Sequence, residues 1–549
     1  MIIRFLKRND YPSSVFTSHN NRRNMNLTPA DSFSKELPAD PNRTNSPRQV
    51  TGAAFSYATP RVPTKPVLVH YSKEMVEAIG LDQATAESEE FLKVVSGAAV
   101  LPGTAPYAMC YGGHQFGHWA GQLGDGRAIN LTEVVRNDRR WALQLKGAGV
   151  TPYSRTADGL AVLRSSVREH LCSEAMHHLG VPTTRSVSLA LTGDQVMRDM
   201  LYDGNPAYEK GAVVCRAAES FVRFGNFQIF AARKDTDNLR KLTDYVIRHF
   251  YPGVEVGTAA GYVDFYRQVT RRTLDMLVHW QRVGFVHGVM NTDNMSALGL
   301  TIDFGPYGWL EGYDENWTPN TTDANGRRYR FGYQPMIGLW NLAQLGSALM
   351  PLVDEVEPMQ EVLDAYKNEY AAKYLAMMRA KLGLFLAEDN DQALIEELTE
   401  TLQLTETDMT IFFRNLADLP ADGPMEDDGT ALLAPVLAAF YQPEELTGLT
   451  LKAWRVWMEK YQLRRSRETA SAAERRTLMN TTNPKYVLRN YMAQMAIDKA
   501  DAGDFSLVNE LYEVLKQPYA EQPGHEQWFA RRPEWARDRV GCSMLSCSS

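Results

Sequence analysis

The sequence lacks several features that would each point to a particular class of protein. No run approaches the ~18 consecutive apolar residues that a membrane-spanning helix needs. Cysteine is scarce, with five in 549 residues, and none stands in the CxxC pairs or Cys/His clusters typical of zinc sites. So sparse and odd a set argues against a disulfide scaffold and for a reducing compartment. The net charge of −8 disfavours nucleic-acid binding, which needs clustered Lys and Arg. We therefore expect neither a membrane nor a nucleic-acid partner.

The composition is that of a globular protein. Hydrophobic residues make up 44% of the chain and aromatic residues 10%, which excludes wholesale disorder. A length of 549 residues predicts two to four domains, or one large two-lobed domain with additions.

Residues 1–50 are rich in Asn, Ser, Pro and Arg and show little apolar periodicity. Five basic residues against one acid in the first 26 fit a targeting peptide, which would send the protein to mitochondria. The alternative is a disordered leader, with initiation at Met25. We favour the leader, and hence a cytoplasmic protein, because such compositional signals are weak.

The order of predicted elements separates a β-rich part from a helical part. Alternation of Trp141, Leu143 and Leu145 predicts a strand over 141–149, and apolar residues every fourth position predict a helix over 158–179. A second helix is expected over 260–286, turns and a short strand over 285–305, and mostly helices from 335 to 520. We therefore predict a mixed lobe over 51–230, a helical lobe over 231–520 and a C-terminal tail over 521–549.

The first candidate site segment is glycine-rich and spans Cys110 to Ala128, "CYGGHQFGHWAGQLGDGRA". Glycines such as Gly124 and Gly126 let backbone N–H groups approach phosphate oxygens, and Arg127 could add a charge-assisted contact. The alternative is that these glycines only mark turns.

A second candidate is Lys146 on the predicted strand, followed by Glu169 on the predicted helix. In protein kinases a helix glutamate holds a strand lysine so that the ammonium group faces ATP phosphates. In isolation, an ordinary edge lysine and a solvated glutamate are the simpler interpretation.

The third and strongest candidate is the set His287, Asp293, Asn294 and "Asp303-Phe304-Gly305". In the kinase pattern H-R-D-x-x-x-x-N the asparagine follows the histidine by seven positions, as it does here. Asn294 and Asp303 would then offer oxygen ligands to Mg²⁺. Alternatively, Asp293-Asn294 forms an Asx-turn, and His287 is a core histidine bonded to backbone.

One departure from the kinase pattern bears on the chemistry. Val289 stands where a kinase has its catalytic aspartate, and an isopropyl group cannot accept a proton. Transfer of the γ-phosphate is therefore disfavoured, and Asp293 is the nearby carboxylate that could take over the role.

A fourth candidate is the pair Arg216 and Arg223. Two guanidinium groups in one pocket suit a polyphosphate, because each can bond it bidentately. Spacing alone does not distinguish them from surface arginines.

Several long segments carry a family resemblance. They are "GHQFGHWAGQLGDGRA", "LKGAGVTPYSRTADGLAVLRSSVRE", "SEAMHHLGVPTTR", "HGVMNTDNMS", "IDFGPYGWLEGYD" and "NPKYVLRNYMAQMAI". On these segments the chain, from about residue 50 onward, resembles the selenoprotein O or YdiU family of protein adenylyltransferases with a pseudokinase fold. The resemblance implies an α+β, protein-kinase-like two-lobed fold with a mixed β-rich N-lobe, a helical C-lobe and helical C-terminal additions.

The resemblance also implies roles for individual residues. Asp293 matches the proposed proton acceptor, Asn294 and Asp303 match Mg²⁺ ligands, and Glu169 supports Lys146. The implied nucleotide-binding residues are Gly124, Gly126, Arg127, Lys146, Asp158, Gly159, Arg216, Arg223 and Asp303. The segment around Asp158 departs from the family, since it is "TADGLAVLR" where many members have "GDGRAVLR".

The activity implied is transfer of AMP from ATP, with Mg²⁺, to Ser, Thr or Tyr hydroxyls of proteins, with release of pyrophosphate. ATP would lie inverted relative to kinases. Redox proteins and the chain itself are implied acceptors. The alternatives are UMP transfer with Mn²⁺, a true kinase, and a non-catalytic ATP-binding regulator.

The C-terminus "VGCSMLSCSS" fits the family as well, because Cys547 stands where many members carry selenocysteine or cysteine. Some members are thought to pair it with a cysteine in the loop after the DFG region. That loop is "NWTPNTTD" here, without cysteine. Cys547 would then pair with Cys542, Cys110, Cys172 or Cys215, or remain a free thiol.

Overall fold

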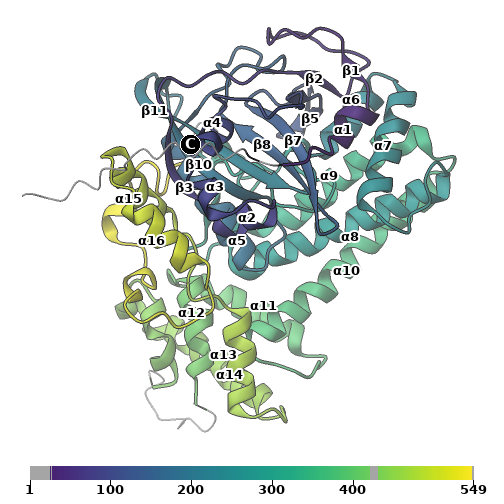
Figure 1. Ribbon diagram of the computed structural model, residues 1–549. Helices are drawn as coiled ribbons and strands as arrows, with labels where there is room; N and C mark the ends of the chain where they lie inside the picture. Colours follow the sequence, from purple (N-terminus) through teal and green to yellow (C-terminus); the bar gives the residue numbers. More distant parts are fainter. Residues whose placement is uncertain (1–24, 26, 421–430, 547–549) are drawn as a thin grey trace, which may run out of the picture.

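A computed structural model describes Met25 and residues 27–420 and 431–546. Its centre is a nine-stranded mixed sheet in the order β1-β2-β4-β7-β8-β11-β10-β3, with β9 paired to β11. Figure 1 shows this sheet in the upper part of the molecule, with α7–α10 beside it and α11–α14 extending below. Its strands, in sheet order, are β1 Ala39–Asp40, β2 Phe55–Tyr57, β4 Tyr107–Met109, β7 Ala128–Arg136, β8 Arg139–Lys146, β11 Ala207–Ala218, β10 Arg185–Arg198, β3 Val67–Tyr71 and β9 Ala161–Val162.

Two short antiparallel pairs stand outside this sheet. One is the hairpin β5 Gly112–Gln115 with β6 His118–Gln122, and the other is β12 Phe285–Val286 with β13 Gly308–Trp309. The second pair flanks the segment that contains the HxxxxxxN and DFG motifs. Both pairs therefore belong to the parts of the chain that the sequence analysis singled out.

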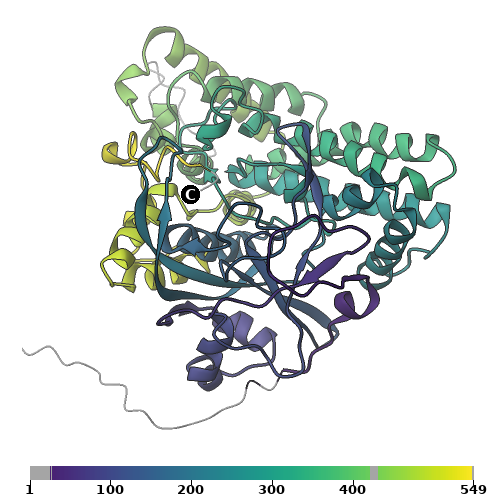
Figure 2. The same ribbon diagram turned by 90° about the horizontal axis from the view of Figure 1, so that it is seen from above.

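Helices dominate the second half of the chain. Figure 2 shows α2–α4 at one edge of the molecule, the green helices of the second half at the opposite edge, and the sheet between them. The helices are α1 Ser32–Glu36, α2 Lys73–Ala78, α3 Gln83–Ala86, α4 Glu89–Val95, α5 Leu163–His178, α6 Phe224–Ala232, α7 Thr236–Phe250, α8 Ala259–Val283, α9 Gln334–Leu349, α10 Glu357–Lys381, α11 Asp391–Leu402, α12 Met409–Asn415, α13 Gly448–Arg465, α14 Ala472–Thr482, α15 Asn490–Asp501 and α16 Ser506–Leu515. The 3₁₀ turns are η1 Thr292–Asn294, η2 Thr321–Asp323, η3 Phe331–Tyr333, η4 Met350–Leu352, η5 Leu416–Asp418, η6 Ala431–Ala439, η7 Pro443–Glu445, η8 Glu526–Trp528 and η9 Glu534–Ala536.

The predicted elements are present, with boundaries set by local chemistry. The helix expected over 158–179 begins later, at Leu163, because the chain turns at Gly159 with φ 68° and then adds β9 to the sheet. α8 begins where the Thr258 side chain accepts the N–H of Gly261, and it ends at Gly284 in the left-handed conformation. The mixed α and β content is confirmed. No described helix has both the length and the apolarity needed to cross a bilayer.

The prediction of a disordered or targeting leader over 1–50 is wrong for residues 27–50. Phe33 is buried in the core, and the Ser32 hydroxyl donates to Glu133 of β7 at 2.7 Å. β1 pairs with β2 in parallel. The few apolar residues of this segment insert between existing elements, so they show no periodicity of their own. Residues 1–24 and 26 lie outside the described residues.

The C-terminal tail packs on the loop after the DFG motif. The backbone N–H of Thr321 donates to the carbonyl of Leu545 at 2.7 Å, and the N–H of Leu545 donates to Pro319 at 3.2 Å. The described cysteines are buried and form no disulfide with one another, and burial raises the pKa of the Cys542 thiol to about 11. The predicted pairing of Cys547 lies outside the described residues.

The buried Glu174 carboxylate of α5 joins this helix to β10, α2 and α16. Glu174 accepts two bonds from the Arg185 guanidinium of β10, each at 2.7 Å, and one from the Ser186 N–H at 3.0 Å. The hydroxyls of Ser72, which caps α2, and Tyr512 of α16 also donate to it, at 3.0 and 3.3 Å. Burial alone would raise the pKa of Glu174, but its bonds to Arg185 outweigh burial and lower the pKa to about 2.

We predict that Glu174→Gln destabilises the protein in a pH-dependent way. The carboxylate contributes stability above its unfolded pKa near 4.5 and loses it as the pH falls towards about 2. A shift of this size corresponds to about 3 kcal/mol. Urea unfolding should show that the free energy of unfolding is lower for Glu174→Gln than for the wild type. This difference should be largest near neutral pH and should decrease below about pH 4.5. Glu513→Gln, on the exposed face of α16, is the control. A difference in the free energy of unfolding that does not change with pH would contradict the stabilising role of the ionised Glu174 carboxylate.

Candidate functional site

A cavity of about 350 Å³ gathers side chains from both halves of the chain. Its walls come from the loop before β7, the end of β8, the loop after it, β11, η1 and the DFG segment. Arginine, lysine and aspartate dominate the charged lining, which suits a ligand that carries both phosphates and a cation. These charged residues are Asp125, Arg127, Lys146, Arg155, Arg216, Asp293 and Asp303.

The glycine-rich loop forms one wall, and packing explains two of its glycines. A Cβ at Gly124, where φ is 90°, would lie 2.4 Å from the Tyr153 ring, and one at Gly126 would lie 2.7 Å from the Tyr153 carbonyl oxygen. Both positions therefore need glycine in order to pack against Tyr153, whether or not phosphate is bound. Arg127 follows directly and faces the cavity.

The predicted lysine–glutamate pair forms. The Lys146 ammonium lies 2.8 Å from the Glu169 carboxylate, which is buried on α5. The other oxygen of Glu169 accepts a bond from the Arg216 guanidinium at 2.8 Å. Glu169 therefore holds two cations at the cavity, one from β8 and one from β11.

Asp303 is the point at which the cations converge. It accepts a bond from Arg216 at 2.7 Å, forms a short ion pair with Arg223, and lies 3.9 Å from the Lys146 ammonium. Burial would raise the pKa of Asp303, but the charges of Arg223, Arg216 and Lys146 outweigh burial and hold the pKa well below its usual range. Its backbone is left-handed, with φ 55°, a conformation that aspartate tolerates better than most residues. The carboxylate is therefore ionised.

A ladder of polar side chains crosses the sheet behind Arg216. Asn130 of β7 pairs in register with Gln144 of β8, and Gln144 pairs with Arg216 of β11. The Arg216 guanidinium donates two bonds to the Gln144 amide oxygen, at 2.9 and 2.6 Å. The Gln144 amide nitrogen donates to Asn130 at 3.2 Å and to Asp125 at 3.3 Å. This ladder fixes the direction of the guanidinium.

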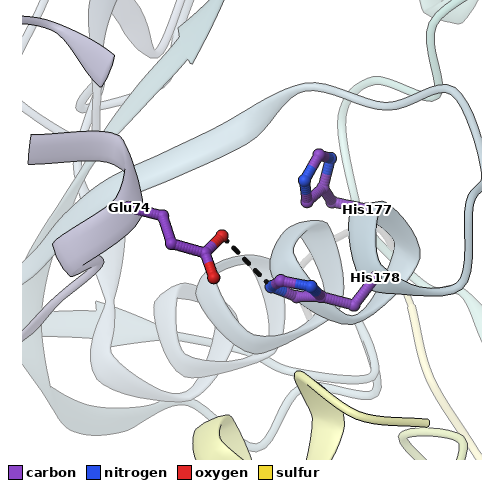
Figure 3. A group of neighbouring side chains, drawn as sticks. All are labelled: Glu74, His177 and His178. Carbon is purple, nitrogen blue, oxygen red and sulfur yellow. Dashed lines mark ion pairs between the residues drawn. The ribbon is translucent and has the colours of Figure 1, made fainter. Parts of the chain in front are cut away.

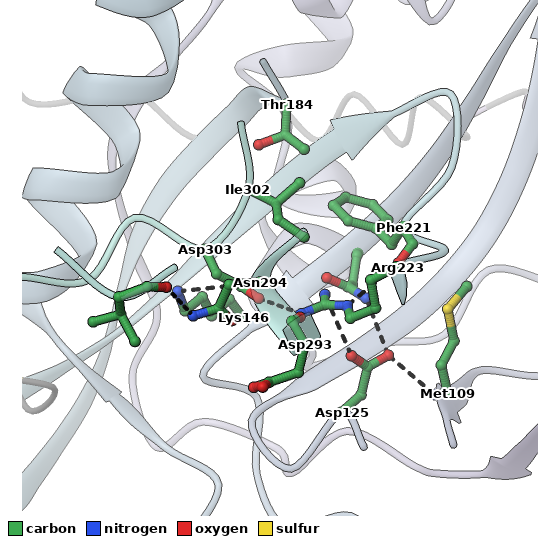
Figure 4. A network of polar contacts seen from close by, with 12 residues as sticks. Met109, Asp125, Lys146, Thr184, Phe221, Arg223, Asp293, Asn294, Ile302 and Asp303 are labelled. Atoms are coloured by element: carbon green, nitrogen blue, oxygen red, sulfur yellow. Dashed lines mark hydrogen bonds and ion pairs between the residues drawn. The ribbon is translucent and has the colours of Figure 1, made fainter. Parts of the chain in front are cut away.

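Arg223 lies behind the cavity wall and contacts residues of η1 and of the glycine-rich segment. One nitrogen donates to the Asp293 carbonyl oxygen at 2.8 Å, and another lies 3.9 Å from the buried Asp125 carboxylate. Figure 4 shows this network, in which Arg223 contacts Asp125 on one side and Asp293 and Asp303 on the other. Asp125 therefore supports the site from behind.

Asp293 points into a confined part of the cavity beneath the β5–β6 hairpin. The Gln115 amide nitrogen donates to its Oδ2 at 3.3 Å, and its buried Oδ1 has no hydrogen-bond partner in the described part of the chain. A Cβ at Gly113 would lie 2.6 Å from that Oδ1. Burial raises the pKa of Asp293 to about 6, although Gln115 and Arg223 act to lower it. The carboxyl group therefore takes up a proton at a higher pH than an exposed aspartate does.

The other candidate residues between His287 and Asn294 have clear positions. The Asn294 amide nitrogen donates to the Val289 carbonyl at 2.9 Å, which fixes the side chain beside Asp293. The buried His287 ring contacts the Ile302 carbonyl at 2.8 Å, which agrees with the interpretation as a core histidine bonded to backbone. The amide oxygen of Asn294 and the carboxylate of Asp303 are the donor types that Mg²⁺ prefers, so the residues present fit such an ion.

Asp158 and Gly159 do not line the cavity. The half-exposed Asp158 carboxylate forms an ion pair with Arg198 at 2.7 Å. It is still close enough to act on Arg127, whose pKa is lowered by burial and by Arg198 and raised again by Asp158. A direct contact of Asp158 or Gly159 with a nucleotide stays a prediction.

Sequence reasoning missed Gln115, Asp125 and Gln144. Gln144 could have been found, because it shares a strand face with Lys146, two positions away. Asp125 lies inside the glycine-rich motif, between Gly124 and Gly126, and that position is the signal that could have identified it. Gln115 carried no signal, because only the folded hairpin brings it to Asp293.

A second cluster, Glu74, His177 and His178, contains ligand types suited to a metal (Figure 3). The Glu74 carboxylate, however, lies 3.1 Å from the Arg185 guanidinium, which would repel a cation. The two histidines are neighbours on the last turn of α5, and their rings lie edge to face with centroids 5.0 Å apart. We assign no metal to this cluster.

Comparison with known proteins agrees with the geometry. The family model "Protein adenylyltransferase SelO" matches residues 45–516. The chain is 57% identical over 524 residues to "Protein nucleotidyltransferase YdiU" of Flavobacterium johnsoniae, covering 95% of this chain and all of the relative. It is 56% identical over 540 residues to the protein of that name from Rhodopirellula baltica, covering 96% of this chain and all of the relative.

The chain belongs to the SelO family. The resemblance deduced from the sequence motifs is thus confirmed, and with it membership of a family of protein nucleotidyltransferases. The reported SelO-family relatives are bacterial, which gives no support to a mitochondrial transit peptide.

We predict that Gln144→Leu weakens binding of ATP, the nucleotide that the family resemblance implies, by about 10- to 100-fold, because the Arg216 guanidinium loses two hydrogen bonds that hold its direction. Isothermal titration calorimetry measures the change. Gln281→Leu is the matched control, since Gln281 is a buried glutamine that bonds the Phe331 carbonyl away from the cavity. Equal affinity in wild type and Gln144→Leu would contradict the role of the ladder.

Proposed function

We propose that this SelO-family chain transfers AMP from ATP to Ser, Thr or Tyr hydroxyls of proteins, in a cleft of protein-kinase type. The observation that carries the proposal is the convergence of Lys146, Arg216, Arg223 and Asp303 around one cavity that also contains Asp293. Family membership supports nucleotide transfer, and the choice of AMP and of these hydroxyls is our own.

The cationic residues would bind the triphosphate. Arg127, Lys146 and Arg216 line the cavity, and each can contact phosphate oxygens. Arg216 would keep its bonds to Gln144 and Glu169 and would exchange only its bond to Asp303 for one to a phosphate oxygen. Neutralising the leaving pyrophosphate in this way lowers the barrier to its departure.

Asn294 and Asp303 would hold Mg²⁺, which when bound offsets negative charge at the phosphates. In the absence of the ion, the Asp303 carboxylate is matched by Arg216 and Arg223. Arg216, which lines the cavity, would exchange Asp303 for a phosphate oxygen when nucleotide and metal bind, whereas the buried Arg223 would keep its bond to the Asp293 carbonyl oxygen. The same carboxylate is thus kept ionised and positioned before the ligands bind.

Asp293 would act as the proton acceptor. The acceptor hydroxyl oxygen attacks the α-phosphorus, the bond to the pyrophosphate oxygen breaks, and the hydroxyl proton passes to Asp293. Gln115 holds one carboxylate oxygen and leaves Oδ1 without a partner among the described residues, so that an oxygen remains to receive the proton. Val289 lies at the position of the kinase aspartate and cannot serve γ-phosphate transfer.

We predict that α-labelled ATP labels protein, whereas γ-labelled ATP does not, and that Asp303→Asn reduces labelling by at least about 100-fold through loss of a metal ligand. Phosphorimaging of gels and the mass of the adduct measure the outcome. Asp389→Asn, distant from the cavity, is the control.

Each alternative function has its own outcome in that experiment. Transfer of the γ-label would identify a kinase, and preferential labelling from UTP with Mn²⁺ would identify a UMP transferase. ATP binding without any adduct would identify a non-catalytic regulator. Any of the three would overturn the proposal.

We further predict that Asp293→Asn lowers kcat by about 10²- to 10⁴-fold, because the amide cannot accept the proton. The dissociation constant for ATP should change little, since Asp293 would face the acceptor hydroxyl. Calorimetry and labelling rates on the same preparation separate the two effects. Undiminished labelling by Asp293→Asn would rule out the role.

A further inference from the structure

A second cavity, of about 290 Å³, lies between the segment after β13 and the C-terminal additions. It shares no lining residue with the nucleotide cavity. Backbone bonds fix its floor, since the Tyr313 N–H donates to the Thr407 carbonyl at 2.8 Å and the Met409 N–H donates to Glu311 at 3.0 Å. The cavity is therefore built by the fold rather than by loose surface loops.

Negative charge exceeds positive charge in this cavity. Glu311, Asp314 and Glu406 face a single lining guanidinium, that of Arg532. Arg532 donates to Glu406 at 2.9 Å and to one oxygen of Glu311 at 3.3 Å. Glu406 is further matched by Arg537 at 2.8 Å.

Glu311 and Asp314 remain short of counter-charge. The Glu311 side chain is 10% exposed, and its Oε1 has no hydrogen-bond partner within the described ranges. A buried carboxylate oxygen without a donor is costly unless a ligand supplies one. Burial raises the pKa of Glu311 to about 7, although Arg489 and Arg532 act to lower it. Asp314 is exposed at the same cavity.

Aromatic rings complete the lining. Tyr313 and Trp317 both border the cavity. Carboxylates beside tyrosine and tryptophan rings form the usual environment for an organic cation, which gains from the ring faces and from the negative charges together. The volume suits a group of side-chain size, since larger ligands occupy sites of roughly 300–1,000 Å³.

We propose that this cavity binds an alkylguanidinium or alkylammonium group, with Glu311 and Asp314 as its counter-ions and Trp317 and Tyr313 as its walls. The group could belong to a free amine or to an arginine or lysine of another protein. The chemistry of recognition is the same in both cases, and the proposal does not depend on nucleotide transfer.

Calorimetric titration of the full chain with two probes tests the proposal. The probes are agmatine and a blocked Gly-Arg-Gly peptide, each titrated with and without saturating ATP. We expect saturable binding with a dissociation constant of about 1 mM or tighter, unaffected by ATP. Tighter binding of agmatine would indicate a free amine, and tighter binding of the peptide would indicate a protein side chain.

Variants assign the binding to this cavity. Glu311→Gln with Asp314→Asn should weaken binding about tenfold or more, in line with the loss of charge-assisted bonds. Asp314→Asn alone, at an exposed position that folding tolerates, should weaken it severalfold, and Glu444→Gln should have no effect. Absence of saturable binding, competition by ATP, or unchanged affinity in Asp314→Asn and the double variant would overturn the proposal.

Discussion

The Arg216 guanidinium is held between two carboxylates, and the candidate site is organised around that contact. Glu169 accepts one bond from α5, and Asp303 accepts another from the DFG segment. The Gln144 amide oxygen accepts two more bonds from the guanidinium through the sheet ladder. Because all of these groups are largely withdrawn from water, removing one partner would leave a buried charge uncompensated, a change that typically costs about 3–5 kcal/mol. These bonds thereby fix the position of the loop after β12 relative to the sheet.

This contact also shapes the electrostatics of the cavity. Lys146, Arg216 and Arg223 are all matched by carboxylates before any ligand arrives. Glu169 pairs with Lys146 and with Arg216, and Asp303 pairs with Arg216 and with Arg223. The cavity can therefore hold a large positive charge without the repulsion that an unmatched cluster would suffer.

Much of the fold and of the site could be predicted because the evidence was local. Strand alternation placed Lys146, helical periodicity placed Glu169, and the seven-residue spacing of His287 and Asn294 marked the catalytic loop. Predictions failed where packing between distant segments decided the outcome. Residues 27–50 have no periodicity, yet Phe33 and Ser32 are buried against β7 and its neighbours. The packing of Leu545 beside Asn320 likewise has no trace in composition.

The sequence by itself determined which chemistry was available: a lysine, two arginines, an amide and carboxylates, with valine in place of the kinase aspartate. It determined the family as well, because the long motifs that identify the family can be read directly from the sequence. Only the tertiary structure decided which of these groups meet. Arg216 and Asp303 are 87 positions apart but share a hydrogen bond, whereas Asp158 turns to Arg198 instead of the cavity. The physical reason is that strand register and helix packing set distances between side chains that are remote in sequence, and no local pattern records those distances.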